Sequence, residues 1–317
     1  FARNLFKKIC DGKINFLRTS NFLQVNKFLK KYNIEKFIIK PDISSGQRGL
    51  FYLNKKEKNL KKIFERSRKF SINKKIIVEE YLDGKEINSV AIIKNSKIVK
   101  YIISERNRYT NPGLGFGIVY NHTNPIQTTK LIRNKIEKIL NKICNKLKIK
   151  NGIIFPQFII KENKIFLIEF SERVPGGLMN KVFEYSTGID LNKYQIDCSL
   201  NKIKNIKNYT KFKKFKYVRI EFLNGPPGIL KDGDVKRIKG INKILKYNNV
   251  KEADLFYSGT TADYKKLKIN KLNFSKDRFF YILYCSNVLF DFKNLHKRVL
   301  KNLKIIGKNN RSMLKIS

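Results

Sequence analysis

The chain has 317 residues, of which 42% are hydrophobic and 12% aromatic, so it can form one large core or two to three smaller lobes. This composition excludes an intrinsically disordered chain, despite a formal net charge of +44. The lysines are scattered through every segment, among many isoleucine and asparagine residues, so the charge favours no single face. A nucleic-acid partner is therefore disfavoured.

The first part of the chain alternates helical and extended patterns. We predict helices over residues 2–10, 20–32 and 58–70, one strand ending at Pro41 and another over residues 74–82. Lys40 closes the first apolar strand and is followed by a Ser/Gly loop over residues 44–49. Glycines allow backbone to approach a ligand closely. The stretch therefore fits either a simple hairpin or a loop that binds a polyphosphate, and it does not decide between them.

The middle of the chain begins with a strand–turn–strand pattern over residues 87–104, with an Asn-Ser turn, and a Gly/Pro/Asn loop follows over residues 111–125. The longest helix is predicted over residues 128–149. We expect its buried face to carry Leu131, Ile132, Ile136, Ile139, Leu140, Ile143 and Leu147. Two strands joined by a tight turn come next, over residues 153–161 and 165–172.

Residues 201–216 are polar and basic, and they form the clearest boundary in the chain. Short strands and turns follow, then a core strand over residues 278–287 and a closing helix from residue 291. The four cysteines (Cys10, Cys144, Cys198 and Cys285) are far apart and include no CxxC pair, which is typical of reduced thiols in an intracellular protein.

No apolar run reaches the about 18 residues that a membrane helix needs. The N-terminus has no signal-peptide pattern either. We therefore expect a cytoplasmic protein without a membrane partner. The chain begins at Phe1 rather than Met, which indicates a fragment or a processed product.

Carboxylate and amide side chains stand at strand ends at informative intervals. Glu79 and Glu80 end one strand, and Glu86 follows across the Asp83–Gly84 turn. Gln157 and Glu169 lie on the two strands joined by a tight turn, so antiparallel pairing would bring them side by side. An unpaired carboxylate inside the apolar run around Glu169 would be costly, which favours a ligand role for it.

This ordered set, with Lys40 and the "SERVPGG" segment, resembles the ATP-grasp carboxylate–amine ligases, the superfamily of biotin carboxylase, carbamoyl-phosphate synthetase, D-alanine ligases and L-amino-acid ligases. The resemblance runs from about residue 1 to 200. It implies an α+β fold, in which two α+β lobes with antiparallel sheets clasp ATP and a small C-terminal α+β lobe follows. The implied division is a nucleotide lobe at about 15–85, a metal and catalytic lobe at about 86–200, a basic linker at 201–216 and a third lobe at 217–317. The family's N-terminal Rossmann-like lobe and its other nucleotide lysine would precede residue 1.

The resemblance also implies how ATP is bound. Lys40 would contact the α- and β-phosphates, and the loop around Ser45, Gly46 and Gly49 would fold over them. The Glu79 side chain would accept a hydrogen bond from the adenine amino group. The backbone of Glu80 and Leu82 would contact the ring edge, and Glu86 would accept from the ribose hydroxyls. The nucleotide site that the resemblance implies therefore consists of Lys40, Ser45, Gly46, Gly49, Glu79, Glu80, Leu82 and Glu86.

The implied metal is Mg²⁺ (or Mn²⁺), held by Glu169 with Gln157 as a second ligand. Ser171 occupies the place where the family usually has a metal-binding asparagine. Arg173 would hold the transferring phosphoryl group. Gln157 and Ser171 leave less negative charge on the metal than is usual, so full metal occupancy or turnover stays open.

The function implied is an ATP-dependent ligase that activates a small-molecule carboxylate as an acyl-phosphate, which an amine then attacks. Arg106, Arg108, the loop 111–117, Gly176 and Gly177 are the expected substrate contacts, and a homodimer is compatible with the resemblance. Two alternatives stay open: a nucleotide-binding protein with little or no turnover, and a basic nucleic-acid-binding protein. Lys40, Arg106 and Arg108 would then be ordinary solvated charges.

Overall fold

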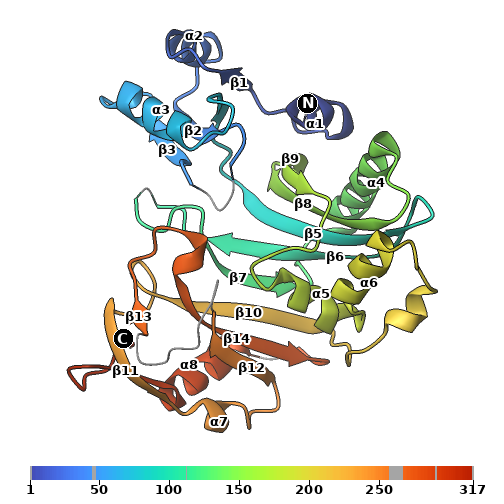
Figure 1. Ribbon diagram of the computed structural model, residues 1–317, viewed down its shortest axis with the longest axis vertical. Coiled ribbons are helices and arrows are strands. Elements are labelled where there is room, and N and C mark those ends of the chain that lie inside the picture. The colour runs from blue at the N-terminus through green and yellow to red at the C-terminus, as the bar shows by residue number, and fades with distance from the viewer. Residues whose placement is uncertain (1, 45–47, 112, 257–266, 290, 316–317) are drawn as a thin grey trace.

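The computed structural model describes residues 2–44, 48–111, 113–256, 267–289 and 291–315 (Figure 1). It is an α+β structure whose sheets are antiparallel throughout the paired strands. The predicted positions of Ser45 and Gly46 lie outside the described residues.

A small lobe forms the upper left of Figure 1 around a four-stranded sheet. The order of its strands is β1 (Phe16–Thr19), β4 (Ile76–Glu80), β2 (Lys36–Pro41) and β3 (Phe51–Asn54). Its helices are α2 (Leu23–Lys31) and α3 (Leu60–Lys69). Val25, Phe28 and Leu29 of α2 are buried against this sheet, as their helical spacing predicts.

The largest sheet has eight strands and forms the centre of the molecule. In spatial order its strands are β12 (Val250–Leu255), β14 (Arg278–Ser286), β10 (Tyr217–Asn224), β7 (Val119–Asn124), β6 (Lys97–Arg108), β5 (Lys85–Lys94), β8 (Gly152–Lys161) and β9 (Lys164–Ser171). β7 falls inside the segment predicted to be a loop. It pairs with β6 and β10 and so joins the middle of the chain to the C-terminal strands.

Helices cover both faces of the β5–β9 end of this sheet. α4 (Lys130–Leu147) and α1 (Ala2–Ile9) pack into one core cluster, and α5 (Met179–Thr187) and α6 (Leu191–Ser199) belong to another. The buried face of α4 is the predicted one, except that Leu131 is 58% exposed. Leu131 lies on the same helical face as the exposed Lys138 and Lys142, whereas the neighbouring Ile132 lies on the buried face.

The C-terminal part adds a three-stranded sheet of β13 (Lys268–Ile269), β11 (Gly233–Lys239) and β15 (Lys304–Gly307). The helices α7 (Ile241–Ile244) and α8 (Phe292–Asn302) complete it, and the 3₁₀ turns Ile206–Tyr209 and Ser275–Asp277 lie in connections. Its larger strands, β10, β12 and β14, continue the central sheet without a break. The boundary predicted at residue 217 therefore does not separate two sheets, because strand pairing crosses it.

Candidate active site

A cavity of about 650 Å³ lies between the small lobe and the central sheet. Most of the residues singled out from the sequence line it: Lys40, Glu79, Glu80, Leu82, Glu86, Arg106, Arg108, Gln157, Glu169, Arg173, Gly176 and Gly177. They come from both sheets and from the turn after β9. Lys40 thus faces the same space as Glu169 and Arg173, which are far from Lys40 in sequence.

The carboxylate of Glu79 lies between two cations. Its Oε1 is 2.6 Å from the ammonium of Lys40, and its Oε2 is 2.5 Å from the guanidinium of Arg3. Arg3 also donates to the backbone carbonyl of Leu167 at 2.9 Å, so it links α1 to β4 and β9. The Glu79 side chain is only 7% exposed. An adenine amino group that donates to this side chain would therefore have to share its oxygens with Lys40 and Arg3.

Charge and burial act in opposite directions in this cluster. Burial raises the pKa of Glu79, but the charges of Lys40 and Arg3 outweigh it and hold the pKa of that carboxyl below its ordinary value. Burial lowers the pKa of Lys40, and Glu79 and Glu169 offset this only in part. The Lys40 side chain is 22% exposed, so the alternative of a freely solvated lysine is wrong.

The connection between the lobes offers backbone groups to the cavity. The N–H of Glu80 donates to the carbonyl of Asn15 at 3.2 Å, and the Glu80 carboxylate accepts from the Asn15 backbone at 3.0 Å. The expected contact of the Glu80 backbone with the ring edge would therefore have to use its carbonyl group rather than its N–H. Leu82 differs: within the described parts of the chain, no backbone hydrogen bond uses its N–H. Leu82 also lines the cavity.

Glu86 is held by two arginines. One oxygen pairs with Arg106 and the other with Arg108, and all three side chains are between 9% and 12% exposed. The guanidinium of Arg108 also lies 5.7 Å from the ring of Phe116, in the predicted loop 111–117. The alternative that these arginines are surface charges is therefore wrong. A ligand that uses Glu86 has to share it with them.

Gln157 and Glu169 are direct partners across β8 and β9. The predicted juxtaposition is thus confirmed, and both residues line the cavity. Glu169 is exposed to it, and no ion pair within the described residues involves Glu169. The argument that its apolar neighbours bury it is wrong, because its side chain is exposed and lines the cavity. Ser171 pairs with Phe155 further along and does not line the cavity.

At two of the predicted glycine positions, the structure shows what a larger side chain would meet. Gly49 has a φ of +74°, and a Cβ there would lie 2.9 Å from the rings of Phe70 and Pro41, so the close turn requires glycine. It does not line the cavity. Gly177 has a φ of +64°, and a Cβ there would lie 3.3 Å from the guanidinium of Arg278. Arg173 is exposed and donates to the neighbouring carbonyl of Val174 at 2.9 Å.

Sequence reasoning missed three cavity or near-cavity residues. Arg3 and Arg278 look like ordinary basic residues in a lysine-rich chain, and no local motif marks them. His122, in the segment predicted to be a loop, lies on β7, is 4% exposed and lines the cavity. Burial, together with Arg106 and Arg278, holds the pKa of His122 well below its ordinary value. A signal was available: His122 lies in an alternating stretch that favours a strand.

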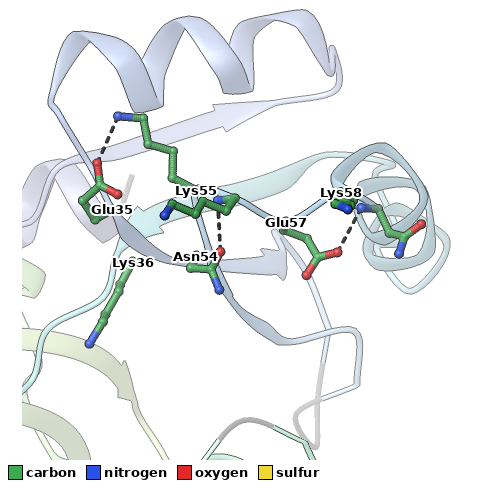
Figure 2. A pocket seen from close by; sticks show the side chains of 8 residues that line it. Glu35, Lys36, Asn54, Lys55, Glu57 and Lys58 are labelled. Atoms are coloured by element: carbon green, nitrogen blue, oxygen red, sulfur yellow. Dashed lines mark hydrogen bonds and ion pairs between the residues drawn. The ribbon is translucent and has the colours of Figure 1, made fainter.

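A second hollow lies on the outer side of the small lobe (Figure 2). It is formed by Glu35, Lys36 and the turn of residues 54–59. Lys55 pairs with Glu35 at 3.0 Å, and the Glu57 carboxylate accepts from the Asn59 backbone at 2.9 Å. These exposed contacts satisfy the local turn. None of the residues predicted for the site lies there.

Residues 1–176 match the model of the phosphoribosylglycinamide synthetase ATP-grasp (A) domain. This match covers more than half of the chain. The chain belongs to the ATP-grasp family. The ATP-grasp assignment agrees with the antiparallel lobes around the cavity. It confirms the resemblance carried by Lys40, Glu79, Glu86 and Glu169.

Individual ATP-grasp relatives are similar over part of their length. Phosphoribosylamine–glycine ligase of Fusobacterium nucleatum is 30% identical over 144 residues, or 42% of this chain and 33% of that protein. D-alanine–D-alanine ligase of Thermosipho africanus is 26% identical over 185 residues, or 55% of this chain and 48% of that protein. The chain thus spans about a third to a half of these curated relatives.

The solved structure of an L-amino acid ligase from Bacillus licheniformis superposes with a TM-score of 0.71 at 16% identity. The superposition covers 97% of this chain and 71% of that one. At this identity the likeness shows the fold alone. It extends through the C-terminal strands, which agrees with the continuous central sheet.

No described helix is long and apolar enough to cross a membrane.

Proposed function

We propose that this protein is an ATP-dependent ligase that activates a small-molecule carboxylate as an acyl-phosphate for attack by an amine. The observation that carries this proposal is the pairing of Gln157 with Glu169 on the wall of the cavity that Lys40 also lines. ATP-grasp membership and the ligase activities named for the two curated relatives support it.

Lys40 and Arg3 would favour the triphosphate. Together they bring two positive charges against the single carboxylate of Glu79, so the cluster holds an excess positive charge. ATP carries roughly four negative charges, which need cations and backbone donors in a cleft with little water. The free N–H of Leu82 would donate to the adenine edge, in the part of the connection where Glu80 is already occupied.

The residues present fit a magnesium ion. Glu169 and Gln157 provide adjacent oxygen donors, and the Glu169 carboxylate faces the cavity without a competing cation among the described ion pairs. Mg²⁺ prefers oxygen ligands together with phosphate oxygens, and when bound it would neutralise charge on the nucleotide. Ser171 is not needed in this arrangement.

The chemistry would proceed in two balanced steps. An oxygen of the substrate carboxylate attacks the γ-phosphorus, and the bond to ADP breaks. The amine nitrogen then attacks the acyl carbon, phosphate leaves, and the amine gives up a proton. Arg173 would offset the charge of the transferred phosphoryl group, since positioning and charge neutralisation dominate such transfers.

A nucleotide-binding protein without turnover is the second candidate. It is favoured by one observation: Ser171 does not line the cavity, so the metal would be held by a single carboxylate and an amide. ADP release in the presence of carboxylate and amine pairs separates the two functions. Tight binding of ATP with no ADP release stimulated by any pair would overturn the ligase proposal.

Glu169→Gln is the informative variant. Under the ligase proposal it lowers substrate-stimulated ADP release by about 100-fold or more, because a charge acting on the transition state is removed. Glu172→Gln is the matched control, since Glu172 is an exposed carboxylate three residues away that does not line the cavity. Equal activity of both variants would contradict the role given to Glu169.

A further inference from the structure

Arg278 is the first residue of β14 and lines the cavity from the C-terminal side of the chain. It is only 8% exposed. Nothing in the roles proposed above uses it. A buried arginine normally pairs with a carboxylate, so its partners decide whether it is structural.

The contacts of Arg278 fix its position without neutralising it. Its Nε donates to the carbonyl of Ser275 at 2.9 Å. Its guanidinium carbon lies 4.2 Å from the ring centroids of both Phe222 and Phe256. Within the described residues, no carboxylate forms an ion pair with Arg278, and its two terminal nitrogens donate to no acceptor.

Arg219 provides a comparison within the same sheet. It also stacks on an aromatic ring, that of Phe292, at 3.8 Å. Unlike Arg278, it pairs with a carboxylate, that of Glu221, at 2.8 Å, and it does not line the cavity. Arg278 thus differs from Arg219: both stack on aromatic rings, but among the described residues only Arg219 pairs with a carboxylate.

The surroundings of Arg278 make its charge costly. Burial and the nearby Arg106 lower the pKa of Arg278 to about 9. Cation–π contacts recover part of the lost hydration, but a buried cation without a counter-ion remains unfavourable. An anion beside the guanidinium would relieve this cost, and the terminal nitrogens match the two oxygens of a carboxylate or phosphate.

The turn after β9 leaves room for such an anion. Gly177 has no Cβ to crowd the guanidinium, and a Cβ on Gly176 would meet nothing within 4 Å. Gly177 follows Arg173 by four residues, a stretch of chain that spans at most about 14 Å. An anion at Arg278 would therefore lie within the length of a small molecule from the phosphoryl-transfer residues.

We propose that Arg278 binds an anionic group, a carboxylate or a phosphate, that belongs to one of the two substrates and is not the group that reacts. The reacting carboxylate has to lie beside the transferred phosphoryl group at Glu169 and Arg173, whereas Arg278 is held in place by Ser275 and two rings. This inference rests on the proposed ligase function. It restricts the substrates to pairs in which one member is an acid in its own right, such as an amino acid or a phosphorylated amine.

The test uses the full chain and compares the binding of each acid with that of its neutral twin, a close analogue in which the anionic group is replaced or removed. Glycine and alanine are paired with their amides, and phosphoethanolamine with ethanolamine, so the first arm tests a carboxylate and the second a phosphate. Binding to the protein saturated with MgADP is measured by calorimetry, and ADP release from MgATP is measured with a panel of carboxylates. We expect an acid to bind at least about 10-fold more tightly than its twin.

Arg278→Gln should weaken binding of the acid by about 10- to 100-fold and leave its neutral twin unchanged, and Arg278→Lys should restore part of the loss. Arg219→Gln is the matched control and should keep the preference for the acid. A purely structural role predicts that Arg278→Gln weakens MgADP and both twins alike. That result, or a panel in which no acid outbinds its twin, would overturn the subsite.

The two proposals fail in different ways. If no pair stimulates ADP release while acids still bind through Arg278, the ligase function is wrong and the anion subsite stands. If ADP release is stimulated and Arg278→Gln leaves the acid preference intact, the subsite is wrong and the ligase function stands.

Discussion

The ammonium of Lys40 lies 2.6 Å from the carboxylate of Glu79 on the neighbouring strand of the small lobe. Because Arg3 occupies the other oxygen of Glu79, one carboxylate holds two cations in place. The single negative charge of Glu79 neutralises only one of these two cations. The cluster thus keeps an excess positive charge beside the cavity, and under the proposed function Glu79 would act on a nucleotide through Lys40.

Glu79→Gln should lower the free energy of unfolding by about 3–5 kcal/mol, because it leaves two largely buried cations without their counter-charge. Urea denaturation followed by circular dichroism measures the change. Glu35→Gln is the control, since Glu35 forms the exposed pair with Lys55 seen in Figure 2 and should cost less than about 1 kcal/mol. Equal losses for the two variants would show that the Glu79 cluster does not stabilise the fold.

Lys40→Ala should weaken binding of a nonhydrolysable ATP analogue by at least about 10-fold, since it removes a charged contact to the phosphates. Lys36→Ala, an exposed lysine on the same strand, should have no such effect. Calorimetry compares the two. A protein that binds nucleic acid through its basic surface would be indifferent to Lys40→Ala and would lose affinity steeply with salt.

Glu86 offers a test with the ligand rather than the protein. If it accepts from a ribose hydroxyl, 2′-deoxy-ATP should bind about 10-fold more weakly than ATP. Glu86→Gln should shrink that ratio, whereas Glu105→Gln, on the adjacent strand and outside the cavity, should preserve it. If the unmodified protein binds ATP and 2′-deoxy-ATP equally well, Glu86 does not accept from the ribose and contacts only Arg106 and Arg108.

Glu184 predicts a pH effect on stability. Burial and the nearby Asp190 carboxylate raise the pKa of Glu184 from 4.5 to about 7. Between these values the folded protein keeps a proton that the unfolded chain has lost, so the free energy of unfolding falls as the pH rises. Glu184→Gln removes this dependence. The free energy of unfolding of the variant minus that of the unmodified protein should therefore be about 1–3 kcal/mol more positive above pH 7 than below pH 4.5. Thermal unfolding across this range checks it, and a constant difference would contradict the prediction.

Local periodicity predicted most of the small lobe and of the β8–β9 hairpin. The Asn95–Ser96 turn has the positive φ angles, 51° and 62°, that a tight hairpin requires. The pairing of Gln157 with Glu169 followed from the short turn between their strands, since register is set by turn length. β7 was missed because its glycine- and proline-rich flanks resemble a loop, while its pairing with β6 and β10 depends on residues far away in sequence.

The polar partners in the site were beyond the reach of local patterns. Glu86 was expected to be available, but it is held by Arg106 and Arg108 from the next strand. Arg3 lies 76 residues from Glu79, and Arg278 reaches the cavity only because β14 joins the central sheet. Spacing identified which strands carry chemistry, whereas tertiary packing determined which charges meet.

The hydrogen bonds between β7 and β10 have a practical consequence for anyone who shortens this chain. Cutting it before Tyr217 would remove β10, the partner of β7. β7 would then become an edge strand with unpaired backbone N–H and C=O groups. Such a fragment would keep every residue assigned to ATP and would still tend to aggregate, because exposed strand edges recruit other chains.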